Sequence, residues 1–280
     1  RGSLLLLAIV AAVAADHKCG YSNVRPNLGM GIQTGNAITG AQEAIAYSWP
    51  WQAIVCVEDW LGDCSWKCSA TIIGDRWVMT TASCVAGRAP KDLRVRVGVF
   101  HPYSKEKQEV RVKVDAIYPN PAYSGSVTKK DNVALIQTDA ITFGDYAQPI
   151  CITDDDGDAL DENKMAWVTG WGYPKKGGSV EHTLQQAKVE INDKVVCERT
   201  WNQNIYVNEI CAGDGGKTIC NNDEGDPLAV QAPSGAWFMH GNAAASDPDC
   251  KLPGIFTKVS SYCSWISALT NDDVKCIKRA

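Results

Sequence analysis

The chain has 280 residues and a net charge of −5, with 45% hydrophobic and 21% charged residues. This balance predicts a packed globular core and excludes a disordered chain, which would be poorer in apolar residues. The acidic net charge argues against nucleic acid as a partner, because a phosphate-binding surface needs clustered Lys and Arg. The 12 cysteines are an even number and indicate an oxidising compartment.

The N-terminus predicts a secretory signal peptide. Arg1 precedes an unbroken run of small and apolar residues from Leu4 to Ala15, which ends in an Ala-x-Ala pattern. The run has 12 residues, whereas a transmembrane helix needs about 20, so no membrane span is expected. The alternative is a buried core helix. We assign residues 1–15 to a signal peptide and expect a secreted, extracellular protein.

Residues 16–37 follow as a short segment without helical or strand periodicity. The segment is rich in Gly, Asn and Pro and contains Cys19. Its composition alone predicts a linker.

Short runs that alternate apolar and polar residues recur after this segment, between Gly, Pro and Asp breaks. The runs are Ala53–Val57, Ala70–Ile73, Trp77–Thr80, Leu93–Val99, Val110–Ile117 and Val133–Gln137. A period of two with frequent turn signals predicts an all-β sandwich or barrel. Helical periodicity is clear only near the end of the chain, at Tyr262, Trp265, Ile266 and Leu269.

The segment from Cys220 to Leu228 reads Cys-Asn-Asn-Asp-Glu-Gly-Asp-Pro-Leu. It resembles the nucleophile loop of the chymotrypsin/trypsin-like serine proteases, which reads Cys-x-Gly-Asp-Ser-Gly-Gly-Pro-Leu. A second similarity is the motif Trp49-Pro50-Trp51-Gln52. The resemblance runs from about Cys19 to about Leu269. It implies two packed antiparallel β-barrels with a C-terminal α-helix over residues 38–270, a tail over residues 271–280, and a zymogen-like propeptide over residues 16–37.

The residues that carry catalysis in these proteases are replaced here. A His takes the proton of the nucleophilic Ser, and an Asp orients the His. The resemblance places Ser83 at the His position, Asp131 at the Asp position and Glu224 at the Ser position. A Ser hydroxyl cannot shuttle a proton as an imidazole does, and Glu224 lacks a base and an acid beside it. We therefore expect no intact catalytic residue, with Asp131 bonded to Ser83 and nearby backbone.

The supporting positions differ as well. The resemblance places the oxyanion donors at the backbone N–H groups of Asn222 and Glu224, and Asn222 replaces a Gly. Asp226 also replaces a Gly, and the added carboxylates would repel an oxyanion. The pocket-equivalent positions are Thr218, Ala244, Ser246 and Gly254. Thr218 at the pocket floor is neutral, so it would not select a basic side chain.

The segment beginning at Ile38 resembles the mature N-terminus of the family, Ile-Val-Gly-Gly. In the family, cleavage frees the Ile amine, which pairs with the Asp before the nucleophile, here Asp223. Ala37 stands where a trypsin-like activating cut needs Lys or Arg. Either another kind of protease cuts after Ala37 or the chain stays single, and we expect the second.

The resemblance also implies disulfide pairs, namely Cys19–Cys151, Cys68–Cys84, Cys197–Cys211 and Cys220–Cys250. The other four cysteines allow three pairings. We prefer the local ones, Cys56–Cys64 and Cys263–Cys276. Neither Cys-x-x-Cys nor His-x3-His spacing occurs, and we expect neither a metal site nor a cofactor.

Two further segments allow alternative interpretations. The acidic run Asp154–Asp158 fits a solvated loop better than a calcium loop, because the spacing of an EF-hand is not met. Trp60 and Trp66 lie in or near the short loop that Cys56–Cys64 would close, and exposed Trp is a common interface anchor. We therefore predict that this loop contacts a partner.

The sequence favours a secreted, non-catalytic serine protease homologue. Such a protein would bind an extracellular protein partner: a protease, a zymogen, an inhibitor or a matrix component. The alternative is a secreted serine-type endopeptidase-like enzyme with weak or atypical activity, and a third option is a structural or storage protein of a secreted matrix. Ser83 and Glu224 are the positions that discriminate between binding and catalysis.

Overall fold

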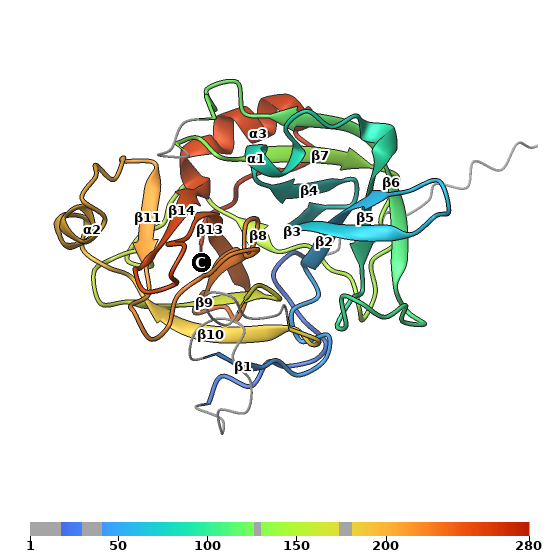
Figure 1. Cartoon of the computed structure of the whole chain (residues 1–280). Helices are drawn as coiled ribbons and strands as arrows, with labels where there is room; N and C mark the ends of the chain where they lie inside the picture. Colours follow the sequence, from blue (N-terminus) through green and yellow to red (C-terminus); the bar gives the residue numbers. More distant parts are fainter. Residues whose placement is uncertain (1–17, 30–40, 126–129, 174–180, 280) are drawn as a thin grey trace, which may run out of the picture.

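The computed structural model describes residues 18–29, 41–125, 130–173 and 181–279 (Figure 1). The predicted signal peptide and the Ala37–Ile38 bond lie outside these residues. Within the described ranges, no helix is both long enough and apolar enough to cross a membrane.

Six strands close into an antiparallel barrel in the order β2-β3-β4-β7-β6-β5 (Figure 1). Their bounds are β2 Gln52–Glu58, β3 Cys64–Gly74, β4 Trp77–Thr80, β5 Leu93–Val97, β6 Val110–Pro119 and β7 Ala134–Thr138. Each contains or overlaps one alternating run of the sequence, which confirms the strands predicted from the period of two.

The strands of the second half of the chain, together with β1 from near its start, form an eight-stranded sheet in the order β1-β10-β9-β12-β13-β14-β11, with β8 parallel to β13. The bounds are β1 Gln42–Glu43, β8 Cys151–Ile152, β9 Met165–Gly170, β10 Gln185–Glu190, β11 Glu209–Ala212, β12 Pro227–Gln231, β13 Trp237–Ala245 and β14 Gly254–Lys258. The path ends at β1 and β11, so this sheet is barrel-like but open. The predicted architecture of two barrels is confirmed, with the second one open.

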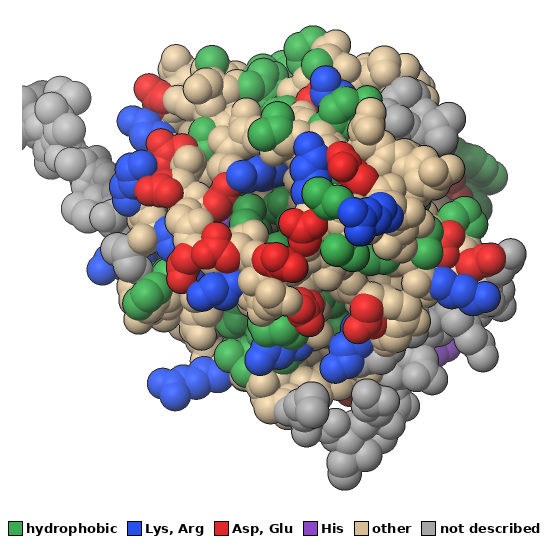
Figure 2. Space-filling view, turned by 90° about the vertical axis from the view of Figure 1, so that its left-hand side faces the viewer, with side chains coloured by type: hydrophobic (Ala, Val, Ile, Leu, Met, Phe, Trp, Pro, Cys, Tyr) green, Lys and Arg blue, Asp and Glu red, His purple; other side chains and the backbone are tan. Residues whose placement is uncertain are grey.

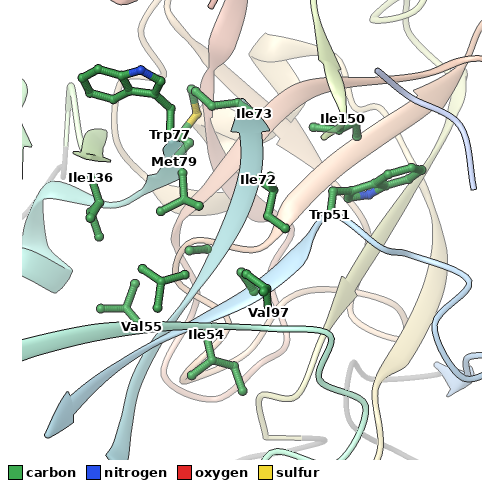
Figure 3. Close-up of a cluster of buried hydrophobic side chains, with 14 of the residues drawn as sticks. Trp51, Ile54, Val55, Ile72, Ile73, Trp77, Met79, Val97, Ile136 and Ile150 are labelled. Atoms are coloured by element: carbon green, nitrogen blue, oxygen red, sulfur yellow. The ribbon is translucent and has the colours of Figure 1, made fainter. Parts of the chain in front are cut away.

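The core of the closed barrel continues into the second sheet. Figure 3 shows buried side chains from β2, β3, β4, β5 and β7 pointing into one cluster. At one end of this cluster, the rings of Trp49 and Trp237 lie 4.7 Å apart in a T-shaped contact, and Trp51 packs beside both. Trp49 precedes β2 and Trp237 begins β13, so these aromatic contacts join the two halves of the molecule.

The predicted C-terminal helix is α3, Cys263–Thr270, which follows the short 3-10 helix η2, Val259–Tyr262. Its Ile266 is fully buried and belongs to the same core cluster as the closed barrel. The structure also contains α1, Ala82–Val85, a 3-10 turn η1, Pro90–Asp92, and α2, Lys194–Trp201.

Helix α2 was not expected from the sequence. The side chain of Asp193 accepts hydrogen bonds from the backbone of Val195 and Val196, which caps the helix, and Asn202 ends it in the left-handed conformation. The helix lacks an apolar stripe, since both valines are about half exposed. On the face of the molecule that carries α2, basic and acidic side chains are interspersed (Figure 2).

All 12 cysteines form disulfides, in the pairs that were expected. Cys263–Cys276 ties the segment after α3 back to the helix. Beyond it, Lys278 pairs with Asp154 and Asp155, and Arg279 pairs with Asp158. Three of the four carboxylates of the acidic run therefore pair with cations near the chain's own C-terminus, an arrangement that the sequence interpretation as a solvated loop did not include.

Candidate functional site

The candidate site lies where the closed barrel and the eight-stranded sheet contact each other. We call this contact region between the two halves of the molecule the seam. Asn132, just before β7, donates its amide to the carbonyl of Ala244 on β13 at 3.2 Å. Asn242 on β13 donates to the carbonyl of Thr80 at the end of β4, also at 3.2 Å. In addition, the N–H of Ser69 on β3 donates to the carbonyl of Glu224 at 3.1 Å. These bonds place the segments that carry the predicted catalytic positions against one another.

Ser83 lies on α1. Thr81, which follows β4 directly, is the N-cap residue of this helix. The side chain of Thr81 caps the helix by accepting from the N–H of Cys84. The hydroxyl of Ser83 donates to the Thr81 hydroxyl at 3.2 Å. The disulfide Cys68–Cys84 fixes this turn to β3 next to Ser69. Ser83 is thus held between neutral groups.

The side chain that orients Ser83 is Asn132, not Asp131. The Oδ1 of Asn132 accepts from the N–H of Ser83 at 2.9 Å, and its Nδ2 donates to the Ser83 hydroxyl at 3.1 Å. Asn132 is fully buried. The hydrogen bond predicted between Asp131 and Ser83 is wrong.

Asp131 points away from Ser83. Its carboxylate accepts from Nδ2 of Asn208 at 2.6 Å and from the hydroxyl of Tyr262 at 2.7 Å. Its backbone is left-handed, with φ of 57°, and Tyr262 belongs to η2. Burial and the Asp131 carboxylate raise the pKa of Tyr262 above its usual value. Asp131 therefore supports the packing of the C-terminal region.

The loop before β12 contains two residues with left-handed backbone conformations, Asn222 and Gly225. Asn222 is left-handed with φ of 71°, a conformation that Asn tolerates better than other non-Gly residues. Gly225 has φ of 93°, and a Cβ there would lie 2.0 Å from the carbonyl oxygen of Ser69. Only glycine fits at this crossing. Glu224 between them is partly buried.

Two carboxyl groups of this loop are completely buried. Asp223 accepts from the N–H of Gly172 at 2.9 Å and of Cys220 at 2.7 Å. Asp226 accepts from Nε2 of Gln52 at 2.8 Å through Oδ1, whereas its Oδ2 receives no hydrogen bond. A Cβ on Gly170 would lie 1.8 Å from that Oδ2, so Gly170 makes room for the carboxyl.

The two buried carboxyls interact directly. Burial raises the pKa of Asp223, although backbone hydrogen bonds oppose the shift. Burial and then the neighbouring Asp223 carboxylate raise the pKa of Asp226 well above its usual value. Two such groups cannot both ionise cheaply without water. We conclude that the pair holds a proton under conditions where an exposed Asp would be charged.

Three of the four residues at the pocket-equivalent positions are buried. The hydroxyl of Thr218 donates to the carbonyl of Leu252 at 2.9 Å, and Thr218 is fully buried. A Cβ on Gly254 would lie 2.4 Å from Cγ1 of Ile219, which is 2% exposed. Ala244 is buried, and Ser246 is partly exposed at the end of β13. The side chain of Ile219 therefore occupies the space beside Gly254.

The histidines in the described ranges have other partners. Nδ1 of His101 lies 2.9 Å from the carbonyl of His182. His240 is fully buried, and its Nδ1 lies 2.7 Å from Asp156. The Asp156 carboxylate also accepts from the hydroxyl of Ser260 at 2.6 Å. Because Asp156 lies between Ser260 and His240, these three side chains do not form a Ser-His-Asp proton relay. His17 lies outside the described residues.

The site contains the hydroxyl of Ser83 and the amide of Asn132 at the places where proton transfer in a serine protease needs an imidazole and a carboxylate. Sequence reasoning located Ser83 and the Glu224 loop, but it missed the role of Asn132 and the contact between Asp223 and Asp226. The Gly-to-Asp replacement at Asp226 was visible in the sequence. Its burial against Gly170 and Gln52 was not, because those residues come from other strands.

Comparison with known proteins agrees with the fold. The family model described as Trypsin matches residues 38–266. Chymotrypsin-C of Rattus norvegicus is 30% identical over 278 residues, covering 95% of this chain and 97% of the relative. Chymotrypsin-C of Bos taurus is 29% identical over 265 residues, covering 91% and 94%. Chymotrypsin-like elastase family member 1 of Rattus norvegicus is 31% identical over 246 residues, covering 84% and 90%. The chain therefore belongs to the trypsin family.

Proposed function

We propose that the chain is a secreted, non-catalytic serine protease homologue that acts by binding an extracellular protein partner. The observation that carries this proposal is the pair formed by Ser83 and Asn132. In the family's mechanism the residue at the place of Ser83 takes a proton, and its neighbour stabilises the cation that forms. A hydroxyl bonded to a neutral amide does neither.

The position of Asn132 strengthens the argument from the sequence. The orienting acid, assigned to Asp131 from the motif, corresponds in this proposal to Asn132, which makes the contacts to Ser83. All three members of the triad are then replaced, by Ser83, Asn132 and Glu224. In a triad enzyme, loss of the Ser or the His alone lowers kcat by a factor on the order of 10⁶.

Peptide hydrolysis tests the non-catalytic half of the proposal. The purified chain, a Glu224→Ala variant and a Ser83→Ala variant are compared on a library of peptide substrates. We expect no turnover above the protein-free blank and no difference among the three proteins. Turnover that disappears in Glu224→Ala would overturn the proposal in favour of a weak or atypical endopeptidase.

Isolation of the native protein tests the binding half. The native protein is purified from the secreted fluid under non-reducing conditions. The mass of any complex that it forms and its N-terminal sequence are then measured. A companion in fixed stoichiometry would support a binding subunit. Self-association without a companion would instead indicate a structural matrix protein. A chain that begins at Ile38 would show that the bond after Ala37 is cut.

A further inference from the structure

A pocket of about 500 Å³ opens beside the seam, within the range of roughly 300–1,000 Å³ typical of ligand sites. Its walls come from the start of β3, from the loop between Phe100 and β6, and from Tyr173 and Asn222 of the second half. Cationic and aromatic side chains dominate the lining, chiefly Lys67, Lys105, Arg111, Trp66, Tyr103 and Tyr173. The expected oxyanion position, Asn222, lies at its edge.

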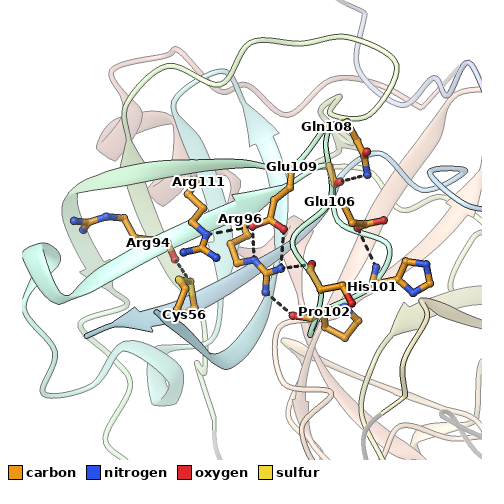
Figure 4. Close-up of polar contacts among 12 residues, drawn as sticks. Cys56, Arg94, Arg96, His101, Pro102, Glu106, Gln108, Glu109 and Arg111 are labelled. Carbon is orange, nitrogen blue, oxygen red and sulfur yellow. Dashed lines mark hydrogen bonds and ion pairs between the residues drawn. A yellow bond between two sulfur atoms is a disulfide. The ribbon is translucent and has the colours of Figure 1, made fainter. Parts of the chain in front are cut away.

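One wall of the pocket is fixed by a buried ion pair (Figure 4). The guanidinium of Arg96 donates to both carboxylate oxygens of Glu109 at 2.8 Å and to the carbonyl of Pro102 at 2.6 Å. The carboxylate of Glu106 accepts from the N–H groups of Phe100 and His101 at 2.6 and 3.0 Å. The loop is therefore held in shape without a ligand, which lowers the entropic cost of binding.

The charge of the pocket is positive and incompletely neutralised. Arg111 lies 3.2 Å from the same Glu109 that already pairs with Arg96, so one carboxylate serves two guanidiniums. Lys67 and Lys105 are exposed and form no ion pair within the described ranges. Asp63 is the one carboxylate in the lining. A cationic pocket on a chain of net charge −5 selects anionic ligands.

Apolar side chains are exposed next to this charge. Trp60 is 89% exposed and Leu61 is 65% exposed at the tip of the β2–β3 hairpin, which projects from the closed barrel (Figure 1). Nη1 of Arg111 donates to the carbonyl of Gly62 at 2.9 Å, which ties the tip to the pocket rim. Large apolar side chains held this far into water are typical of interfaces.

Trp66 lies in the wall of the pocket and not at the hairpin tip. Its ring contacts Tyr103 and Trp171 in T-shaped arrangements, with centroids 6.3 and 6.4 Å away. It is partly buried and forms the wall of the pocket, whereas Trp60 alone has the exposure of an interface anchor.

We infer that the pocket and the hairpin tip form a docking surface for an acidic segment of a partner protein that also carries an apolar side chain. Carboxylates of the segment would pair with Lys67, Lys105 and Arg111. Its apolar side chain would pack on Trp60 and Leu61. These apolar contacts favour a peptide over a sulfated polysaccharide, which would use the cations alone. The inference rests on the proposed binding role, for which it names the class of partner.

A binding titration tests the docking surface. The probe is a fluorescein-labelled synthetic peptide of repeating Glu-Glu-Phe, and its anisotropy is followed as protein is added. The double variant Lys67→Ala/Lys105→Ala should raise Kd about tenfold. The matched control Lys113→Ala/Lys188→Ala removes two exposed lysines outside the pocket and should leave Kd unchanged. Equal effects in both variants, or none in the first, would overturn the inference.

Three further comparisons decide the chemistry. A Gln-Gln-Phe peptide should bind at least tenfold more weakly, because its side chains are neutral. Trp60→Ala should weaken the acidic peptide but not heparin. If Trp60→Ala leaves the Kd of the acidic peptide unchanged and heparin displaces that peptide, the pocket belongs to a polysaccharide instead. If the native companion stays bound to the lysine double variant, the surface is wrong and the binding role stands; if wild type has no companion, the binding role fails.

Discussion

Removing one of the two buried carboxyls should make the protein more stable at neutral pH. Asp223 and Asp226 are both completely buried and lie against each other. Asp226→Asn keeps the acceptor that Gln52 uses and places an amide where Oδ2 now receives no hydrogen bond. The variant therefore removes one titratable carboxyl of the pair without leaving a cavity.

The magnitude follows from proton linkage. Burial raises the pKa of Asp223 from 3.8 to about 7, and each unit corresponds to about 1.4 kcal/mol. Because the folded state holds the proton more tightly than the unfolded chain, the free energy of unfolding falls as pH rises between these two values. The stabilising effect of the proton is complete below about pH 4. Between pH 5 and pH 8 the pair should cost the wild type about 2–3 kcal/mol.

The assay is urea unfolding at fixed pH values from 5 to 8, with disulfides intact and the Ala37–Ile38 bond uncut, so that no freed amine can pair with Asp223. Asp226→Asn should reduce the pH dependence, because it removes the carboxyl whose pKa burial and the Asp223 carboxylate raise, while the part that burial of Asp223 itself causes should remain. Asp139→Asn, at an exposed carboxylate, is the matched control and should retain it. A wild-type stability that is constant or rises over this range, or an equal slope in wild type and Asp226→Asn, would refute the reasoning.

Three other substitutions test the seam and the C-terminal region by the same unfolding assay. Gly225→Ala should cost about 3 kcal/mol, because its Cβ would meet the Ser69 carbonyl. Asn132→Asp should cost about 2–4 kcal/mol at pH 8, since it places a buried carboxylate against the Ala244 carbonyl; adding Ser83→His should recover part of this loss. Val274→Ala should cost about 1–3 kcal/mol, because Val274 is buried.

Each of these expectations has an outcome that contradicts it. A neutral Gly225→Ala would mean that the nucleophile loop does not cross β3 as closely as described. Equal stability of Asn132→Asp and wild type would contradict the buried, amide-bonded position of Asn132. Lys278→Ala, which removes an exposed ion pair, is the surface control for Val274→Ala and should not shift the unfolding midpoint.

The β-strands could be predicted from the sequence because their signal is local. Alternation of apolar and polar residues follows directly from a half-buried strand, and Trp77–Thr80 has the bounds that the pattern gave. Helix α2 escaped prediction for the opposite reason. Its valines are exposed and β-branched, so the apolar period that marks α3 is missing, and only the capping residues Asp193 and Asn202 signal it.

The contacts of the candidate site could not be predicted from neighbouring residues in the sequence alone. Asp131 and Asn132 are adjacent, and the motif led us to assign Asp131 to the position that faces Ser83, whereas Asn132 makes the contacts to Ser83. The choice depends on the left-handed backbone of Asp131 and on the contact between Asn132 and Ala244 across the seam. The cationic pocket could not be foreseen either, because Lys67, Lys105 and Arg111 come together only when the loop closes over Arg96.

We propose that the site cannot transfer protons, whether or not the chain is cut before Ile38. The most direct measurement is peptide hydrolysis by a chain that has been cut before Ile38 through an inserted enteropeptidase sequence, because the cut removes zymogen latency as an explanation. We expect no turnover above the blank, in the cut chain as in the uncut one. Turnover that begins on cutting and is abolished by Glu224→Ala would contradict it.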